Sequence, residues 1–146
     1  MIEQLREELE EDEGCMRKTY LDHLGYKTVG IGHLCKEGEP EFDMEVGTPV
    51  SEERVAELFK KDIGWTISDC QKLVPDFDML PTECRLILSN MMFNMGLNRM
   101  SRFLRLLAAV EERRWGKAAD EMLDSKWATQ VPARSGRLIA RMRALA

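Results

Sequence analysis

The hydrophobic periodicity of the chain changes abruptly near Gly14, and this change constrains the fold more than any other feature. Before it, Ile2, Leu5 and Leu9 recur at helical spacing between charged residues, which predicts an amphipathic helix that ends near Gly14. After it, residues 18–33 are rich in β-branched and aromatic side chains interrupted by glycines, which predicts a small antiparallel sheet with tight turns. The chain therefore begins as a helix followed by a sheet.

Most of the remaining chain is predicted to be helical. Residues 36–49 are acidic and show no clear period, so they are expected to form a surface loop. Ser51 precedes two glutamates, an N-cap pattern that predicts a long helix from there towards Leu73. Thr82 opens a segment that is apolar on nearly every face and ends at Gly96, as expected of a central helix. Shorter helices are expected around residues 101–112, 115–124 and 134–144, with a break at residues 127–132.

These elements predict an α+β fold with two lobes. A small sheet lobe, about residues 14–50, is joined by the long helix, about 51–73, to a helical lobe, about 74–146, which also takes helix 1–13. The 146 residues, 44% of them hydrophobic and 32% charged, suit one soluble globular domain over the whole chain. We expect the ligand site in a cleft between the lobes.

The charge and the cysteines narrow the function. A formal charge of −5 argues against nonspecific nucleic-acid binding. The stretch from Arg99 onward is rich in arginine and could form a local basic face, but the favoured interpretation is that these charges lie on solvated helix faces. The four cysteines lack metal-ligand spacing, so a metal site is not expected. No cofactor is expected either. Two disulfides are possible, but free thiols are favoured because the acidic N-terminus is not a secretory signal. These cysteines are Cys15, Cys35, Cys70 and Cys84.

Two carboxylates stand in settings that suit acid and base chemistry. Glu13 would end the first helix, and Asp22 would lie in or beside the first turn of the sheet. Glycoside hydrolysis needs one acid to protonate the departing oxygen and a second carboxylate to act on water or on the sugar cation. Their spacing alone also allows the alternative that both are surface charges in an acid-rich chain.

The stretch that contains these carboxylates resembles a known family. The stretch resembles the phage-type lysozymes of glycoside hydrolase family 24 in its residues and their spacing. Eight residues separate Glu13 from Asp22, five separate Asp22 from Thr28, and the segment from Val29 to His33 follows. Further segments resemble the family in the same order along the chain. These segments are residues 58–62, 90–96, 114–115, 125–127 and 130–134.

The resemblance implies a mostly helical lysozyme-like fold and a set of site residues. Glu13 becomes the general acid, Asp22 the second carboxylate, and Thr28 the holder of the attacking water. Leu34 and Phe93 look like substrate-contacting positions on either side of the cleft. The implied activity is that of an endolysin-type muramidase, which cleaves the β-1,4 bond between N-acetylmuramic acid and N-acetylglucosamine in bacterial peptidoglycan. A carboxyl separation of about 6.5–9.5 Å, typical of inverting enzymes, is expected.

Other positions carry structural expectations or depart from the family. His33 could be a general acid or base, but the family pairs this histidine structurally, and Asp62 is the matching partner. Leu106 and Glu121 stand where the best-known member has Ser and Asn, so we expect the contacts with the sugar to differ there. The loop that follows Cys35 is also shorter than in that member.

Two functional classes follow from these observations. The first is an active muramidase that acts as a monomer on peptidoglycan, without nucleic acid, membrane insertion or cofactor. The second is a catalytically weak binding or scaffolding module that keeps the lysozyme fold. The chain shows no export signal, so we expect a phage version to wait in the host cytoplasm for a holin, and an exported version to depend on a segment outside this sequence.

Overall fold

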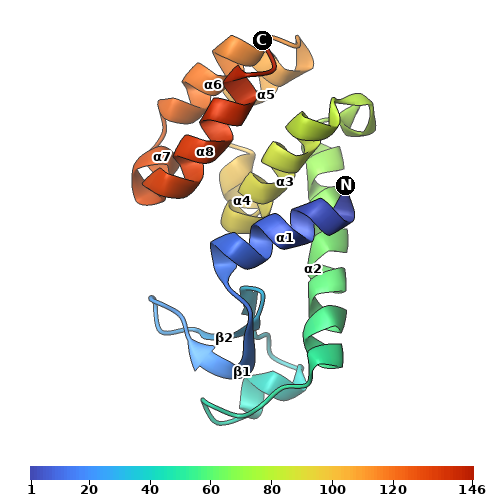
Figure 1. Cartoon of the computed structure of the whole chain (residues 1–146), viewed down its shortest axis with the longest axis vertical. Helices are drawn as coiled ribbons and strands as arrows, with labels where there is room; N and C mark the ends of the chain where they lie inside the picture. Colours follow the sequence, from blue (N-terminus) through green and yellow to red (C-terminus); the bar gives the residue numbers. More distant parts are fainter. The chain divides into compact units, whose positions relative to one another are not determined.

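The computed structural model describes all 146 residues, which form eight α-helices, two short 3₁₀ helices and one three-stranded antiparallel sheet (Figure 1). This composition confirms the expected α+β class. The chain divides into two compact units, residues 2–65 and residues 66–146 with Met1. Helix α1 is grouped with the sheet in the first unit, and its expected place in the helical lobe stays a prediction.

The first unit holds the sheet and the helices next to it. The sheet has the order β1-β2-β3, so β2 is the central strand. Tyr20 of β1 and Leu34 of β3 are the direct cross-strand partners of Thr28 on β2. The helix and strands of the first unit before α2 are α1 (Ile2–Glu13), β1 (Met16–Leu21), β2 (Lys27–Gly30) and β3 (His33–Leu34).

The loop after β3 is more ordered than the sequence predicts. It contains a 3₁₀ helix, Pro40–Asp43, whose Glu41 is buried and paired with Arg54 at 2.7 Å. The ammonium group of Lys27 donates hydrogen bonds to two carbonyl oxygens of the same loop, those of Phe42 and Met44. A lack of periodicity predicted an irregular segment, but these charged contacts fix its conformation.

The long helix α2 (Glu52–Leu73) begins where the N-cap pattern placed it. The Ser51 hydroxyl accepts a hydrogen bond from the backbone N–H of Arg54 at 3.1 Å, which satisfies one of the free donors at the helix start. Val55 packs against Gly30 of the sheet, where an added Cβ would lie only 3.1 Å from the valine side chain. Residues up to 65 belong to the first unit and the rest of α2 to the second.

The second unit is helical and has one continuous hydrophobic core. Helix α3 buries nine of its fourteen residues, which confirms the expectation of a central helix, and it ends at Gly96 with a φ of +82°. No helix of the chain combines the length and hydrophobicity that a membrane span requires. The elements after α2 are a 3₁₀ helix (Phe77–Met79), α3 (Thr82–Met95), α4 (Leu97–Met100), α5 (Leu104–Glu111), α6 (Trp115–Leu123), α7 (Lys126–Gln130) and α8 (Pro132–Arg143).

The expected break at residues 127–132 is wrong, because a short helix, α7, occupies most of it. Ser125 caps this helix by accepting a hydrogen bond from the N–H of Ala128 at 3.2 Å. Trp127 is buried, and its indole N–H donates to the side-chain oxygen of Asn94 on α3 at 2.8 Å. A tertiary anchor that sequence periodicity does not reveal therefore stabilises a helix too short to be stable alone.

Candidate active site

Asp22 lies in the turn between β1 and β2, and the turn itself holds its carboxylate. The Oδ1 atom accepts hydrogen bonds from the backbone N–H groups of Leu24 and Tyr26 at 2.9 and 2.8 Å. The backbone N–H of Asp22 also donates to the Tyr26 carbonyl at 2.8 Å, so the β1–β2 ladder continues through this residue. This geometry fixes the carboxylate while leaving its second oxygen, Oδ2, for another partner.

Thr28 lies on the central strand, on the same face of the sheet as Asp22. Tyr20 and Leu34 are opposite Thr28, and directly opposed residues of an antiparallel ladder project from the same face. Asp22 follows Tyr20 by two positions and therefore also projects from that face. We call the four residues Tyr20, Asp22, Thr28 and Leu34 the site face.

The site face combines a buried centre with a more open rim. Thr28 is buried and its hydroxyl donates to the Tyr26 carbonyl at 3.0 Å, whereas Tyr20 and Asp22 are half-buried and Leu34 is exposed. The hydroxyl proton of Thr28 is thus committed to the backbone, and its oxygen keeps the capacity to accept a hydrogen bond.

Glu13 is the last residue of α1 and packs on the turn between β2 and β3. An added Cβ at Gly32 would lie 3.1 Å from the Cβ of Glu13 and 3.2 Å from its Oε1. Gly32 also has a φ of +60°, a conformation that glycine adopts without steric cost. Glycine at this position therefore allows the backbone of the turn to approach the Glu13 side chain closely.

Tyr20 is electrostatically linked to both carboxylates. Burial raises the pKa of the Tyr20 phenol, and the nearby carboxylates of Glu13 and Asp22 raise it further. A phenol with a raised pKa stays neutral and remains a hydrogen-bond donor. The sequence did not mark Tyr20 as a site residue, although its position two residues before Asp22 on a predicted strand was the available signal.

His33 lies between two carboxylates. Its Nδ1 is 2.7 Å from Oδ2 of Asp62, the expected partner on α2, and its Nε2 is 2.9 Å from Oε1 of Glu39 in the loop. Burial lowers the pKa of His33, but its hydrogen bonds with Asp62 and Glu39 outweigh burial and the net pKa is raised. Burial likewise opposes the lowered pKa of Glu39, which results from its hydrogen bonds with His33 and the Lys36 N–H. The resemblance did not identify Glu39. Through Glu39 and Asp62, His33 connects the loop after β3 to helix α2.

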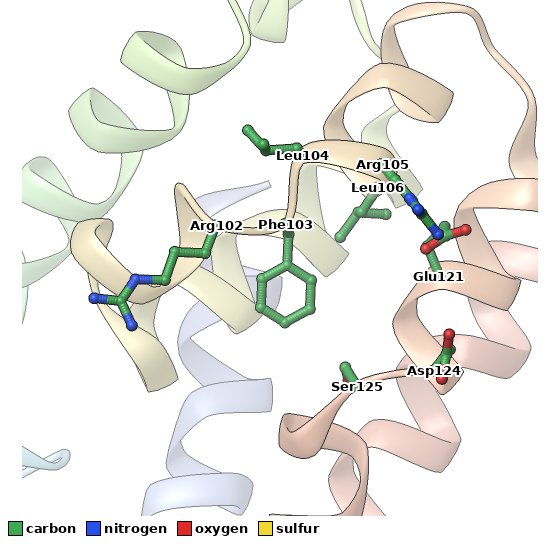
Figure 2. A pocket seen from close by; sticks show the side chains of 8 residues that line it. All are labelled: Arg102, Phe103, Leu104, Arg105, Leu106, Glu121, Asp124 and Ser125. Atoms are coloured by element: carbon green, nitrogen blue, oxygen red, sulfur yellow. The ribbon is translucent and has the colours of Figure 1, made fainter.

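Phe93 lies in the second unit, half-buried on α3, and so is not on the site face. The same unit contains a pocket of about 350 Å³ that includes Leu106 and Glu121 in its lining. Figure 2 shows Phe103 and Leu106 on one side of this pocket and Glu121 on helix α6 on the other. Lys117 pairs with Glu121 at 2.8 Å, which neutralises that carboxylate within its own helix.

The four cysteines are free thiols, and their burial sets their reactivity. Cys15 is exposed, whereas the other three are buried. Burial raises the pKa of Cys70 and of Cys84 to about 12, so these two are unreactive thiols in the folded chain.

The structure thus gathers Asp22, Thr28 and Leu34 on one sheet face and places Glu13 against Gly32 in the same unit. Sequence comparison agrees with this arrangement, because residues 10–144 match the family model described as phage lysozyme. The chain is 31% identical to probable T4-type lysozyme 2 of Dictyostelium discoideum over 159 aligned positions, which cover 96% of this chain and 94% of that protein.

Two phage proteins match over a smaller share of their own length. The chain is 30% identical to the pre-baseplate central spike protein Gp5 of Enterobacteria phage T4, over 92% of this chain and 26% of that protein. It is also 30% identical to the peptidoglycan hydrolase gp36 of Pseudomonas phage phiKMV, over 94% of this chain and 15% of that protein. With its family model matched over nearly the whole sequence, the chain belongs to the phage lysozyme family and is a glycoside hydrolase.

Proposed function

We propose that this protein cleaves the β-1,4 bond between N-acetylmuramic acid and N-acetylglucosamine in bacterial peptidoglycan, with inversion at the anomeric carbon. Membership of the family supports hydrolysis of peptidoglycan. The observation that carries the finer assignment is the shared sheet face of Asp22 and Thr28, because it presents a carboxylate and a hydroxyl acceptor to one water molecule.

Glu13 is the general acid of this proposal. It donates a proton to the glycosidic oxygen as the bond to the leaving sugar breaks, which avoids the release of a strongly basic alkoxide. The end of α1 and the contact with Gly32 limit the positions that its carboxyl can take. Such restriction is valuable because proton transfer depends steeply on the distance to the reacting oxygen.

Asp22 is the general base. Its Oδ1 is held by two backbone N–H groups, and Oδ2 accepts a proton from water as the oxygen of that water attacks the anomeric carbon. The hydroxyl oxygen of Thr28 accepts a hydrogen bond from the second hydrogen of the same water, since the Thr28 hydroxyl group donates its own hydrogen bond to the Tyr26 carbonyl. Attack by water rather than by the carboxylate gives a product of inverted configuration.

The sugar contacts extend beyond the site face. Leu34 offers an exposed apolar surface to the saccharide, and Phe93 is proposed as a second contact. The pocket at Leu106 and Glu121 is a candidate subsite with altered chemistry, because an apolar side chain and a paired carboxylate replace two neutral polar groups. We expect weaker hydrogen bonding to the saccharide at that subsite.

A Glu13→Gln variant tests the assignment of the acid. It keeps the shape of the side chain and removes the proton donor, so the variant should fold and lose at least 100-fold in the rate at which a peptidoglycan suspension clears, on the order expected for a general acid. Glu11→Gln is the matched control, because Glu11 is an exposed residue of the same helix and its loss changes the net charge equally. A Glu13→Gln variant that clears walls at the rate of the control would remove Glu13 from the mechanism.

The configuration of the product tests the role of Asp22. NMR of freshly released oligosaccharide should show the α-anomer first, and a β-anomer would instead indicate retention with a covalent intermediate. If the unmodified protein binds peptidoglycan but releases no reducing sugar, the binding or scaffolding module is the correct alternative.

A further inference from the structure

Tyr20 occupies the position opposite the proposed water-holding residue. It is the direct cross-strand partner of Thr28, and such pairs have Cβ atoms about 4.5–5.5 Å apart on one face of the sheet. Asp22 lies two residues further along the same ladder. The proposed base, the proposed water holder and the tyrosine ring therefore project side by side from three neighbouring positions.

The hydroxyl group of Tyr20 is free to bind a ligand. Tyr20 is half-buried, but its hydroxyl makes no hydrogen bond to another protein group. Ser89 carries the one buried side-chain oxygen without a partner, so the Tyr20 hydroxyl must be reached by solvent. Its raised pKa keeps it protonated, and it can therefore donate a hydrogen bond close to Glu13 and Asp22.

The hydrogen-bonding capacity of the attacking water defines what is missing from the proposed mechanism. A water molecule donates two hydrogen bonds and accepts two. In the mechanism above, its hydrogens point to Asp22 and Thr28, and one lone pair attacks the anomeric carbon. The second lone pair needs a donor, and neither an ionised carboxylate nor a threonine hydroxyl already committed to the Tyr26 carbonyl provides one.

We propose that the neutral hydroxyl of Tyr20 donates a hydrogen bond to the attacking water and, with Asp22 and Thr28, fixes its orientation towards the anomeric carbon. This inference rests on the proposed function, since it requires Asp22 and Thr28 to hold the nucleophile. It makes Tyr20 a third residue in contact with the reacting water. Its contribution is orientation, because the phenol neither gains nor loses a proton during the reaction.

A Tyr20→Phe variant of the whole chain provides the test, because it removes one oxygen and keeps the ring. With a soluble, uncross-linked peptidoglycan oligosaccharide as substrate, kcat should fall about tenfold, the loss expected for one hydrogen bond in the transition state, while KM changes less than twofold. The alkaline limb of the pH–rate profile should stay in place, because a group that remains neutral does not titrate there. An unchanged kcat, or a loss expressed wholly in KM, would overturn the proposal.

A double-mutant cycle with Thr28→Val separates water positioning from packing. If both hydroxyls hold the same water, the Tyr20→Phe and Thr28→Val effects on kcat should be non-additive, with the double variant losing less than the product of the two single losses. Fully additive losses would contradict the shared water. Failure of this inference is distinct from failure of the proposed function: an active Glu13→Gln variant refutes the mechanism itself, whereas an inactive one beside a fully active Tyr20→Phe refutes only the role of Tyr20.

Discussion

Replacement of Gly32 by alanine should damage both the stability of the chain and the position of Glu13. The residue has a φ of +60°, and a side chain in this left-handed region costs about 1–2 kcal/mol. The added methyl group would also lie 3.1 Å from the Cβ of Glu13 and 3.2 Å from its Cγ and Oε1. Carbon atoms in good contact lie about 3.5–4.0 Å apart, so the glutamate side chain must move by several tenths of an ångström.

The displacement should appear in the rate more than in the stability. The expected loss of stability is that of one side chain in the left-handed region, whereas the group that the new methyl displaces, Glu13, is the proposed general acid. A misplacement of about 1 Å can cost on the order of 100-fold in rate, and a shift of a few tenths should cost about tenfold in kcat. We therefore expect Gly32→Ala to lose about 1–2 kcal/mol of unfolding free energy and about a factor of ten in kcat.

Gly47→Ala is the matched control for backbone strain. Gly47 belongs to the same unit and has a φ of +92°, but an added Cβ there would meet no atom within 4 Å. Urea unfolding should show a loss of stability in both variants, whereas the soluble-substrate assay should show a fall in kcat only for Gly32→Ala. Equal kcat values for the two variants would refute the conclusion that Gly32 sets the position of Glu13.

Three further predictions follow from the ion pairs, the tryptophan anchor and the thiols. Because the pKa of His33 is raised from 6.5, the contribution of His33 to stability should be fully present below pH 6.5 and should fade as the pH rises through its folded pKa. The pKa of Glu39 is lowered, so the contribution of Glu39 should disappear as the pH falls through its folded pKa. In urea unfolding, His33→Asn should flatten this pH dependence of stability, and an unchanged pH dependence would contradict the pairing. Trp127→Phe should cost about 1–2 kcal/mol in urea unfolding, because the amide oxygen of Asn94 loses its donor, and no loss would show that water replaces it. Thiol labelling of the native chain without reductant should modify Cys15 rapidly and the three buried cysteines only on unfolding, whereas a mass lower by two hydrogens would reveal a disulfide.

The fold could be predicted from the sequence wherever local chemistry determines local structure. The N-cap at Ser51 and the glycine at the end of α3 are local signals, and both helices have the ends that these signals predict. Helix α7 could not be predicted in this way, since it depends on the burial of Trp127 against α3, more than thirty residues away in the chain. The order in the loop at Glu41 likewise depends on Arg54, which only the folded chain brings near.

Part of the candidate site could likewise be predicted from the sequence, and part depends on the folded chain. Spacing and resemblance were enough to select Glu13, Asp22 and Thr28, because the motif that carries them is continuous in sequence. The shared face with Tyr20 depends on the register of the ladder, and a shift by one residue would turn Tyr20 away from Thr28. The sheet contains an irregularity between Met16 and Tyr20, so counting residues from the strand start does not predict that register.

The charge of the chain is distributed unequally between its two units, and this distribution bears on whether the chain can bind an anionic cell wall. The net charge of −5 suggests that an anionic cell wall would repel the chain, and this repulsion, together with the altered positions Leu106 and Glu121, favours a non-catalytic module. The charges are segregated, however: residues 1–65 hold 17 acidic and 8 basic side chains, whereas residues 66–146 hold 9 acidic and 13 basic, or −9 and +4. At physiological salt, electrostatic forces fade beyond about 8 Å, so a polyanion responds to the local surface rather than to the net charge. Arg102 and Arg105 are exposed and line the pocket of the second unit, so this surface offers positive charge to such a partner. The acidic composition is therefore compatible with an enzyme that binds an anionic wall.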